Sequence, residues 1–253
     1  MFGICNLAIA PLRVEPSDRS EIVSQVLFGE HFEILELQKM WARIKLHYDG
    51  YVGWIDVKQF RNISQSDYDS LCADAEILSG DLIEYVSDQN NMLMPVPLGS
   101  SLAFLNHDEI NSEYYSYEGL RTNGIKPKDK IIETAFLYLN APYLWGGKTP
   151  FGIDCSGFTQ MVYRLNGYKL LRDASMQATQ GEPLSFIEES EPGDLAFFDN
   201  DEGRIVHVGI IMDDNYIIHA SGKVRIDRLD HLGIFNADVN RHTHKLRVIK
   251  KYI

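Results

Sequence analysis

The segment Asp154-Cys155-Ser156-Gly157-Phe158 stands where a loop pattern gives way to a helical one. A loop is predicted before it because Pro142 and the pair Gly146-Gly147 break helices. After Cys155 the apolar residues are spaced i, i+3, i+4 and i+7, which predicts one buried helical face, and Asn166-Gly167 predicts the helix end. The four apolar residues are Phe158, Met161, Val162 and Leu165.

Cys155 is predicted in the first turn of this helix, on its inward face, because it stands three residues before Phe158. Asp154 is a natural N-cap. The positive end of the helix dipole favours the thiolate, which is the reactive form of cysteine. The carboxylate of Asp154 works against it, because it disfavours a second negative charge. We therefore expect a histidine to supply most of the activation; a buried, inert cysteine is the alternative.

Two histidines stand on strand patterns that follow the helix. Residues 206–211 alternate in period two around His207, and residues 216–220 form the returning strand with His219. Because both histidines are odd-numbered, they share a face only if the loop holds an odd number of residues or a bulge. A three-residue loop at 212–214 would place them directly opposite each other.

Cys155, His207 and His219 together supply the parts of a nucleophilic site. His207 would take the thiol proton and return it to the leaving amine. His219 would hold the His207 ring in the right tautomer. Each histidine alone could equally be structural. The three residues together predict Cys-dependent acyl transfer, and first of all cleavage of an amide bond.

The chain from about residue 126 to its end resembles the NlpC/P60 family, which are papain-like cysteine peptidases of bacterial cell-wall peptides. The resemblance implies an α+β fold with a papain-like catalytic domain, in which N-terminal helices pack on an antiparallel sheet. It also implies Cys155 as nucleophile, His207 as base and His219 as the third, polar member. The matching segments, in the expected order, are 143–147, 154–158, 192–195, 207–210 and 218–220.

Within the family, residues 171–177 resemble the segment that follows the catalytic helix in γ-D-glutamyl-L-diamino acid endopeptidases, which act on small, free peptides. In those enzymes an Asp beside the catalytic Cys binds the free amine of the substrate, and Asp154 occupies that position. A buried amine needs such a carboxylate partner. The resemblance also implies substrate contacts for Ser156 and Ser175 and places Tyr143 near the attacked carbonyl. A plain helix cap for Asp154 and a loop hydroxyl for Ser175 are the alternatives.

Short strand patterns and the hairpin signal Asp49-Gly50 predict a small all-β barrel over residues 1–62. This part resembles a bacterial SH3 domain. In the free-peptide enzymes a Glu and a Tyr of that domain help to close the amine pocket. Glu15 and Tyr51 stand at the nearest matching positions. A solvated carboxylate for Glu15 and ordinary sheet packing for Tyr51 are the alternatives.

The rest of the chain is divided as follows. Residues 63–79 are predicted to form a connecting helix, and residues 80–122 a second SH3-like domain. The peptidase domain is predicted over residues 123–253, and it opens with a helix at 128–140. The buried stripe of that helix would be Ile131, Ile132, Ala135, Phe136 and Leu139.

Composition limits the partners. The 253 residues carry a formal net charge of -12, with 24% charged and 45% hydrophobic residues, as in ordinary globular proteins. Such a chain has room for more than one domain and a sizeable core. The acidic charge argues against nucleic acid and against polyanionic wall polymers as partners. It suits a cationic or zwitterionic peptide.

No cofactor and no metal site is predicted. His242 and His244 share a strand face but offer too few ligands, so solvated side chains are expected there. A disulfide between Cys5 and Cys72 is left open. No segment is long and apolar enough for membrane insertion, and residues 1–10 lack the basic start of a signal peptide. We therefore expect a cytoplasmic enzyme, or a periplasmic or extracellular one if the N-terminus has been trimmed; the oligomeric state is left open.

The resemblance implies hydrolysis of the γ-D-glutamyl–L-diamino acid bond in short murein peptides with a free N-terminal L-alanine, for turnover or recycling of cell-wall peptides. Cys155 would form a thioester that water then hydrolyses. The backbone N–H of Cys155, with Tyr143 beside it, is the expected oxyanion donor. Two alternatives are a cysteine amidase or acyltransferase on the same fold, and a non-catalytic module that binds cell-wall peptides.

Overall fold

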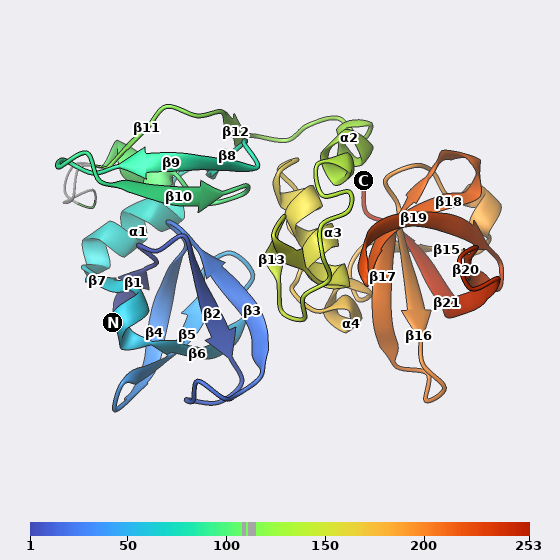
Figure 1. Ribbon diagram of the computed structural model, residues 1–253, viewed down its shortest axis with the longest axis horizontal. Helices are drawn as coiled ribbons and strands as arrows, with labels where there is room; N and C mark the ends of the chain where they lie inside the picture. Colours follow the sequence, from blue (N-terminus) through green and yellow to red (C-terminus); the bar gives the residue numbers. More distant parts are fainter. Residues whose placement is uncertain (108–109, 111–114) are drawn as a thin grey trace. The chain divides into compact units, whose positions relative to one another are not determined.

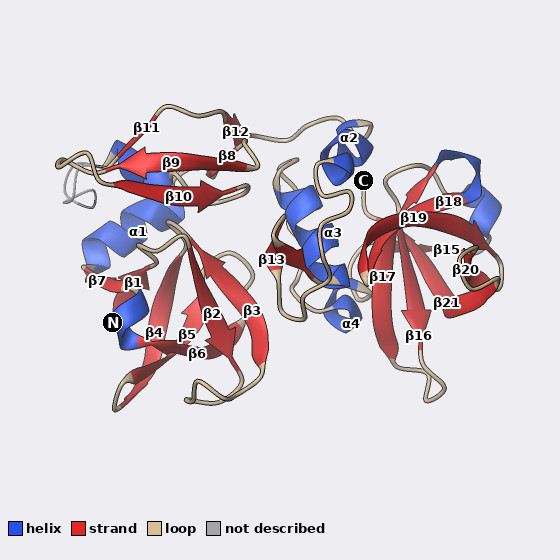
Figure 2. Ribbon diagram, viewed as in Figure 1, coloured by secondary structure: helices blue, strands red, loops and turns tan. Residues whose placement is uncertain are grey.

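The computed structural model describes residues 1–107, 110 and 115–253. The chain divides into two compact units, Met1–Gly124 and Ile125–Ile253 (Figure 1). Strands dominate both units and the helices are short, which confirms the α+β class (Figure 2). Every helix among these residues is too short or too polar to cross a lipid bilayer.

The first unit begins with a seven-stranded antiparallel sheet in the order β3-β2-β6-β5-β4-β1-β7. Alternate side chains, such as Leu12, Val26 and Ile44, are fully buried in its core. The predicted hairpin is present: Gly50 has a positive φ of 72°, and Asp49 accepts the backbone N–H of Tyr51. The strands are β1 (Phe2–Ile4), β2 (Ile9–Arg13), β3 (Ile22–Leu27), β4 (His31–Gln38), β5 (Trp41–Leu46), β6 (Val52–Asp56) and β7 (Arg61–Ile63), with a 3₁₀ turn η1 (Val57–Gln59).

The connecting helix is shorter than the predicted 63–79. Helix α1 spans Gln65–Ala73 and is fixed by a capping box between Ser64 and Asp67. Short strands follow and pair as β10-β9-β11 and as β12-β8. The second SH3-like domain, predicted over 80–122, includes residues 108–109 and 111–114, which lie outside the described residues, and its assignment stays a prediction. The elements are β8 (Ile77–Ser79), β9 (Ile83–Ser87), β10 (Leu93–Pro97), η2 (Ala103–Asn106), β11 (Ser116–Tyr117) and β12 (Arg121–Asn123).

The second unit begins with helices. The helix predicted at 128–140 is only α2 (Lys130–Phe136), and Asn140, with a φ of 67°, ends the turns that follow it. Its predicted stripe is partly wrong: Ile131 and Ala135 are buried, whereas Phe136 and Leu139 are exposed. Thr134 is buried within α2, and Tyr138 is buried because the chain tightens into turns after residue 136. The other elements are β13 (Lys148–Thr149), β14 (Gly152–Ile153), α3 (Cys155–Arg164) and α4 (Ala174–Gln177).

A closed barrel completes this unit. The sheet order is β15-β21-β16-β17-β18-β19-β20, and β20 also pairs back with β21, so six strands form a ring. Ala196, Phe198 and Ile217 belong to a fully buried core on one face of these strands. Helix α3 packs against β17 and β18. The elements are β15 (Glu182–Leu184), η3 (Ile187–Glu189), β16 (Leu195–Asp199), β17 (Ile205–Met212), η4 (Asp213–Asn215), β18 (Tyr216–Ser221), β19 (Lys223–Asp230), β20 (Gly233–Asn236) and β21 (Arg241–Lys251).

The loop between β17 and β18 lies one residue later than predicted, which moves the partner of His219 by two residues along β17. It spans 213–215 rather than 212–214, and Asp214 and Asn215 adopt the positive φ angles that these residue types tolerate. The loop is three residues long, so His207 and His219 do share a face. However, His219 stands opposite Gly209 and not opposite His207.

Candidate active site

The start of α3 is fixed by Asp154, as predicted. One carboxylate oxygen of Asp154 accepts the backbone N–H of Gly157 at 2.6 Å, which caps the helix. The other oxygen accepts the backbone N–H of Gly146 at 2.8 Å. A single buried carboxylate therefore holds both the glycine loop and the first helical turn, and it positions Cys155 at the helix start.

Asp154 has a further partner that sequence reasoning missed. Arg172, only 1% exposed, donates from Nη1 and Nη2 to the two carboxylate oxygens at 3.0 and 2.6 Å. It also donates to Oγ of Ser156 at 3.0 Å. With Gly146 and Gly157, four N–H groups now occupy the roughly four lone-pair sites of the carboxylate. The charge of Asp154 is thus compensated within the protein, and its contact with a substrate amine stays a prediction.

The Cys155 thiol is buried beside the strand that carries His207. The backbone amides of Val208 and Ser156 hydrogen-bond to its sulfur. Burial and the charge of Asp154 raise the pKa of Cys155 to about 12, although these amides and Arg172 act in the opposite direction. The thiol is therefore protonated near neutral pH, and a base has to remove its proton during attack.

A chain of hydrogen bonds runs behind His207. Its Nε2 lies 2.8 Å from Nδ1 of His219, and Nε2 of His219 lies 3.0 Å from a carboxylate oxygen of Asp227. His207 and His219 are not directly opposite, but residues on diagonal cross-strand positions are within reach of long side chains. The three side chains come from β17, β18 and β19, which are neighbours in the barrel.

Burial sets the protonation of this chain. It lowers the pKa of His207 well below the ordinary 6.5, helped by the neighbouring His219 and His244. It also lowers the pKa of His219, and Asp227 counteracts this only in part. Two neutral rings carry one N–H each. If Asp227 takes the N–H of His219, then Nδ1 of His219 accepts from His207, and Nδ1 of His207 is left as an acceptor.

His244 also belongs to this cluster. Its ring stacks on the ring of His207, with centroids 4.1 Å apart and an angle of 27° between the planes. Burial lowers the pKa of His244 to about 4. The expectation of a solvated side chain is therefore wrong for His244. It holds for His242, which is exposed and pairs with Asp230 at 2.9 Å.

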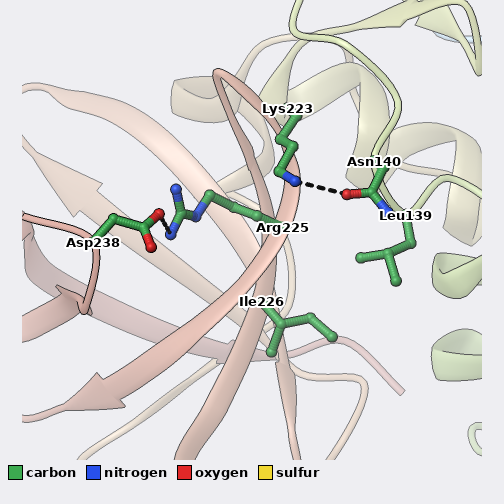
Figure 3. A pocket seen from close by; sticks show the side chains of 6 residues that line it. All are labelled: Leu139, Asn140, Lys223, Arg225, Ile226 and Asp238. Carbon is green, nitrogen blue, oxygen red and sulfur yellow. Dashed lines mark hydrogen bonds and ion pairs between the residues drawn. The ribbon is translucent and has the colours of Figure 1, made fainter.

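Asp227 is held in place from its other side by Arg225. The guanidinium lies 2.7 Å from Asp227 and 2.8 Å from Asp238, so it bridges two carboxylates. Arg225 and Asp238 line a pocket of about 270 Å³ together with Lys223 and Asn140, which share a hydrogen bond (Figure 3). The ion pair with Arg225 thus holds Asp227 in place at the end of the hydrogen-bonded chain Asp227–His219–His207, which we call the relay.

The remaining predicted substrate residues are distributed over both units. Ser156 is buried against Arg172. Tyr143 is half-buried, and its pKa is raised to about 12 by burial and by the charges of Cys155 and Asp154, which places it close to both. Ser175 is exposed on α4. Their contacts with substrate stay predictions.

Glu15 and Tyr51 belong to the first unit. Glu15 is exposed on the loop after β2, where its backbone N–H donates to Oγ of Ser20. Tyr51 is half-buried and packs against the core of the N-terminal sheet. Both positions agree with the simpler interpretations, solvation and sheet packing, and a role in an amine pocket stays a prediction.

Asp227 was missed in the sequence, although a local sequence signal could have located it. Gly222, with a φ of 70°, makes a tight turn between β18 and β19, and the resulting register puts Arg225 opposite His219. A turn predicted at Gly222 would have placed Asp227 two residues after Arg225, on the same face of β19 as Arg225. Arg172 and His244 had no such local signal, because they reach the site only through the tertiary fold.

Two segments of the chain match known protein families. Residues 140–241 match the NlpC/P60 family, and residues 12–60 match the bacterial dipeptidyl-peptidase Sh3 domain. The first match contains Cys155, His207, His219 and Asp227. The second match lies within the N-terminal seven-stranded sheet.

Curated relatives match along most of the chain. Dipeptidyl-peptidase 6 of Lysinibacillus sphaericus is 28% identical over 258 aligned residues, which cover 91% of this chain and 92% of the relative. Gamma-D-glutamyl-L-lysine dipeptidyl-peptidase of Bacillus cereus is 26% identical and covers 81% of this chain and 68% of its own length. Both alignments are long enough to include both units.

A solved structure has the same fold. An NlpC/P60 family protein from Bacillus cereus aligns with a TM-score of 0.83 and covers 100% of this chain and 99% of its own. The two sequences are 19% identical, so this likeness is one of fold alone.

Proposed function

We propose that this cysteine peptidase hydrolyses the γ-D-glutamyl–L-diamino acid bond of short murein peptides. The match of residues 140–241 to the NlpC/P60 family and that of residues 12–60 to the bacterial dipeptidyl-peptidase Sh3 domain support the proposal. The substrate we propose carries a free N-terminal L-alanine. The proposal extends to turnover or recycling of cell-wall peptides, with the cytoplasm as its location.

The observation that carries the proposal is the hydrogen-bonded chain Asp227–His219–His207 beside the buried thiol of Cys155. A protonated thiol needs a base, and a neutral imidazole with a free acceptor nitrogen is a suitable one. The chain leaves Nδ1 of His207 as that acceptor. Its direction therefore supports Cys155 as nucleophile, His207 as general base and His219 as the residue that orients it.

In the proposed reaction, Nδ1 of His207 takes the proton from Cys155 as its sulfur attacks the γ-carbonyl carbon of D-glutamate. The negative oxygen of the tetrahedral intermediate is stabilised by the backbone N–H of Cys155, which is free of intrahelical bonds because it lies in the first turn. The C–N bond then breaks, and His207 gives its proton to the leaving amine. Water, activated by His207, hydrolyses the thioester and restores the thiol.

The proposed selectivity for a free amine rests on the carboxylate of Asp154 and on the acidic charge of the chain. Asp154 lies next to the nucleophile, and the chain as a whole is acidic, which favours a cationic amine. Because Arg172 and two backbone N–H groups already occupy the Asp154 carboxylate, the amine would displace one of these donors. Ser156, Ser175, Tyr143, Glu15 and Tyr51 complete the set of proposed substrate contacts.

The names of the relatives support the type of bond. The relative from Bacillus cereus is named for a γ-D-glutamyl-L-lysine bond. Lysine and diaminopimelate both present an L-centre after D-glutamate, so both are tested as the diamino acid.

The test is mass spectrometry of L-Ala-γ-D-Glu-diaminopimelate and L-Ala-γ-D-Glu-L-Lys after incubation with the protein. The same peptides with an acetylated N-terminus run beside them, together with the Cys155→Ala variant. We expect release of L-Ala-γ-D-Glu from the free peptides only, and only when Cys155 is present. Equal cleavage of the acetylated peptides would contradict the amine requirement. Product trapped by added amines instead of water would indicate an acyltransferase, and no turnover at all would contradict the peptidase assignment.

A further inference from the structure

The N-terminal unit contains a second group of reactive side chains, distinct from the peptidase site. His31, His47 and Cys72 each present one ligand atom, and all three atoms lie within 4.8 Å of one another. The sulfur of Cys72 is 3.2 Å from Nδ1 of His47 and 3.7 Å from Nε2 of His31. No disulfide joins Cys5 and Cys72, so the sulfur of Cys72 is available as a ligand.

The fold brings together His31 at the start of β4, His47 directly after β5 and Cys72 on α1. The register of β4 and β5 pairs Phe32 with Leu46, and one step further along it places His31 opposite His47. The backbone N–H of His47 donates to the carbonyl of His31 at 3.1 Å, which fixes this pair. Cys72 stands in the last turn of α1, which packs against β4. The imidazole rings stack with centroids 4.6 Å apart.

The separations suit a tetrahedral metal ion. Zinc lies about 2.3 Å from a thiolate and about 2.0–2.1 Å from an imidazole nitrogen, so a tetrahedral angle sets sulfur and nitrogen roughly 3.6 Å apart. The two observed sulfur–nitrogen distances lie on either side of that value. One thiolate and two imidazoles are also a typical zinc ligand set, with a fourth position left for water.

The surroundings favour a cation as well. The ring of Tyr68 contacts both imidazoles edge-on, stacks on Phe2 and hydrogen-bonds to Cys72. It covers one side of the cluster with apolar surface and supplies the outer hydrogen bond that ligands of a metal usually have. The carboxylate of Asp69 acts electrostatically on Cys72 and on Tyr68, that of Glu33 acts on Tyr68, and negative charge nearby stabilises a bound dication.

We propose that His31, His47 and Cys72 form a zinc site that ties helix α1 to strands β4 and β5. Binding would release the Cys72 proton to solvent and leave the peptidase chemistry untouched. Such a site would stabilise the N-terminal unit by an amount that grows with the logarithm of the free zinc concentration once that concentration exceeds Kd.

The test uses the full chain with Cys155→Ala, because the catalytic thiol and its histidine could themselves hold a metal ion. Co²⁺ is titrated into the metal-free, reduced protein, and Zn²⁺ is then added. We expect a thiolate-to-cobalt charge-transfer band that saturates at one Co²⁺ per chain and disappears as Zn²⁺ displaces it. The band should be absent after the additional substitution Cys72→Ser.

Matched histidine variants make the test specific. In the same Cys155→Ala protein, His47→Gln removes an exposed ring of the cluster, and His242→Gln removes an exposed ring elsewhere. We expect zinc affinity to fall at least about 100-fold in the first and to stay unchanged in the second. Absence of the band in Cys155→Ala, its survival after Cys72→Ser, or equal losses in the two histidine variants would overturn the proposal. Because His47 is exposed, this arm stands even if Cys72→Ser folds poorly.

Discussion

His207 and His219 are neutral and hydrogen-bonded to each other, so a third group has to fix the tautomer of each ring. In this chain it is Asp227, because a carboxylate can only accept and so takes the N–H of His219 at Nε2. His219 must then accept from His207 at Nδ1. Burial raises the pKa of Asp227, but the hydrogen bonds from His219 and Arg225 outweigh it and keep this pKa below its ordinary value, so Asp227 stays ionised.

Asp227→Asn should therefore lower kcat more than it changes KM. An amide can donate to Nε2 of His219, which reverses the tautomer of both rings and turns Nδ1 of His207 into a donor. We expect kcat to fall about 10²-fold and KM to change little. Steady-state kinetics on the free peptide measures both.

The matched control is Asp230→Asn, on the same strand. Asp230 pairs with the exposed His242 and lies outside the relay, so kcat should stay the same. The pH dependence of kcat/KM gives a second measurement. In the unchanged protein kcat/KM should fall on the acid side only below pH 6.5, because burial lowers the pKa of the general base His207. An equal loss of kcat in both variants, or an acid limb above pH 6.5, would contradict this role for Asp227.

At the scale of elements, the β17–β18 hairpin brings His207 and His219 together on diagonal positions, because His219 pairs with Gly209 and not with His207. His219 stands opposite Gly209, and the missing side chain of Gly209 leaves space for Cβ of His219. A Cβ on Gly209 would lie 2.8 Å from Cβ of His219, much closer than side-chain carbons approach one another. The glycine is therefore part of the site, although it carries no functional group.

Gly209→Ala should consequently damage activity more than folding. The added methyl group must push His219 or Ile217 aside, which we expect to cost about 1–3 kcal/mol of stability and to lower kcat at least tenfold. Urea unfolding and steady-state kinetics measure the two effects. Val206→Ala, at an exposed position of the same strand, is the control and should leave both unchanged. If Gly209→Ala kept full kcat, the offset register would have no part in positioning His219.

The same hairpin shows how far the sequence leads. The parity of residues 207 and 219 predicted a shared face correctly, and the spacing of Phe158 and Met161 predicted α3 and its cap at Asp154. The loop position was wrong by one residue, because Asp214 and Asn215 both accept positive φ angles, and the local pattern does not choose between neighbouring turns. Arg172 and His244 could not be predicted, since only tertiary packing brings them to Cys155 and His207.

The whole molecule should be sensitive to acid because of this buried histidine cluster. His207, His219 and His244 all have pKa values lowered by burial, so they are neutral in the folded protein at pH values where the unfolded chain binds protons. Stability therefore falls as the pH drops below 6.5. For His244, with a pKa of about 4, the loss between pH 7 and pH 5 is about 1 kcal/mol after allowance for its partial exposure.

Urea unfolding at pH 7 and pH 5 checks this prediction. His244→Phe keeps a ring that can stack on His207 but removes one titrating group, so its stability should fall less between the two pH values. His242→Gln, which changes an exposed ring, should behave like the unchanged protein. A stability that rises as the pH falls from 7 to 5 would contradict the account.

The buried pair of Asp154 and Arg172 also has a consequence for inheritance. Loss of either residue alone leaves an uncompensated charge beside the nucleophile, which costs about 3–5 kcal/mol in typical proteins. Descendants of this chain can therefore change the two positions only together, through a rare double step. Ser175 and Glu15, which we propose as substrate contacts, are exposed, so selection for a different substrate would meet less resistance at these two positions.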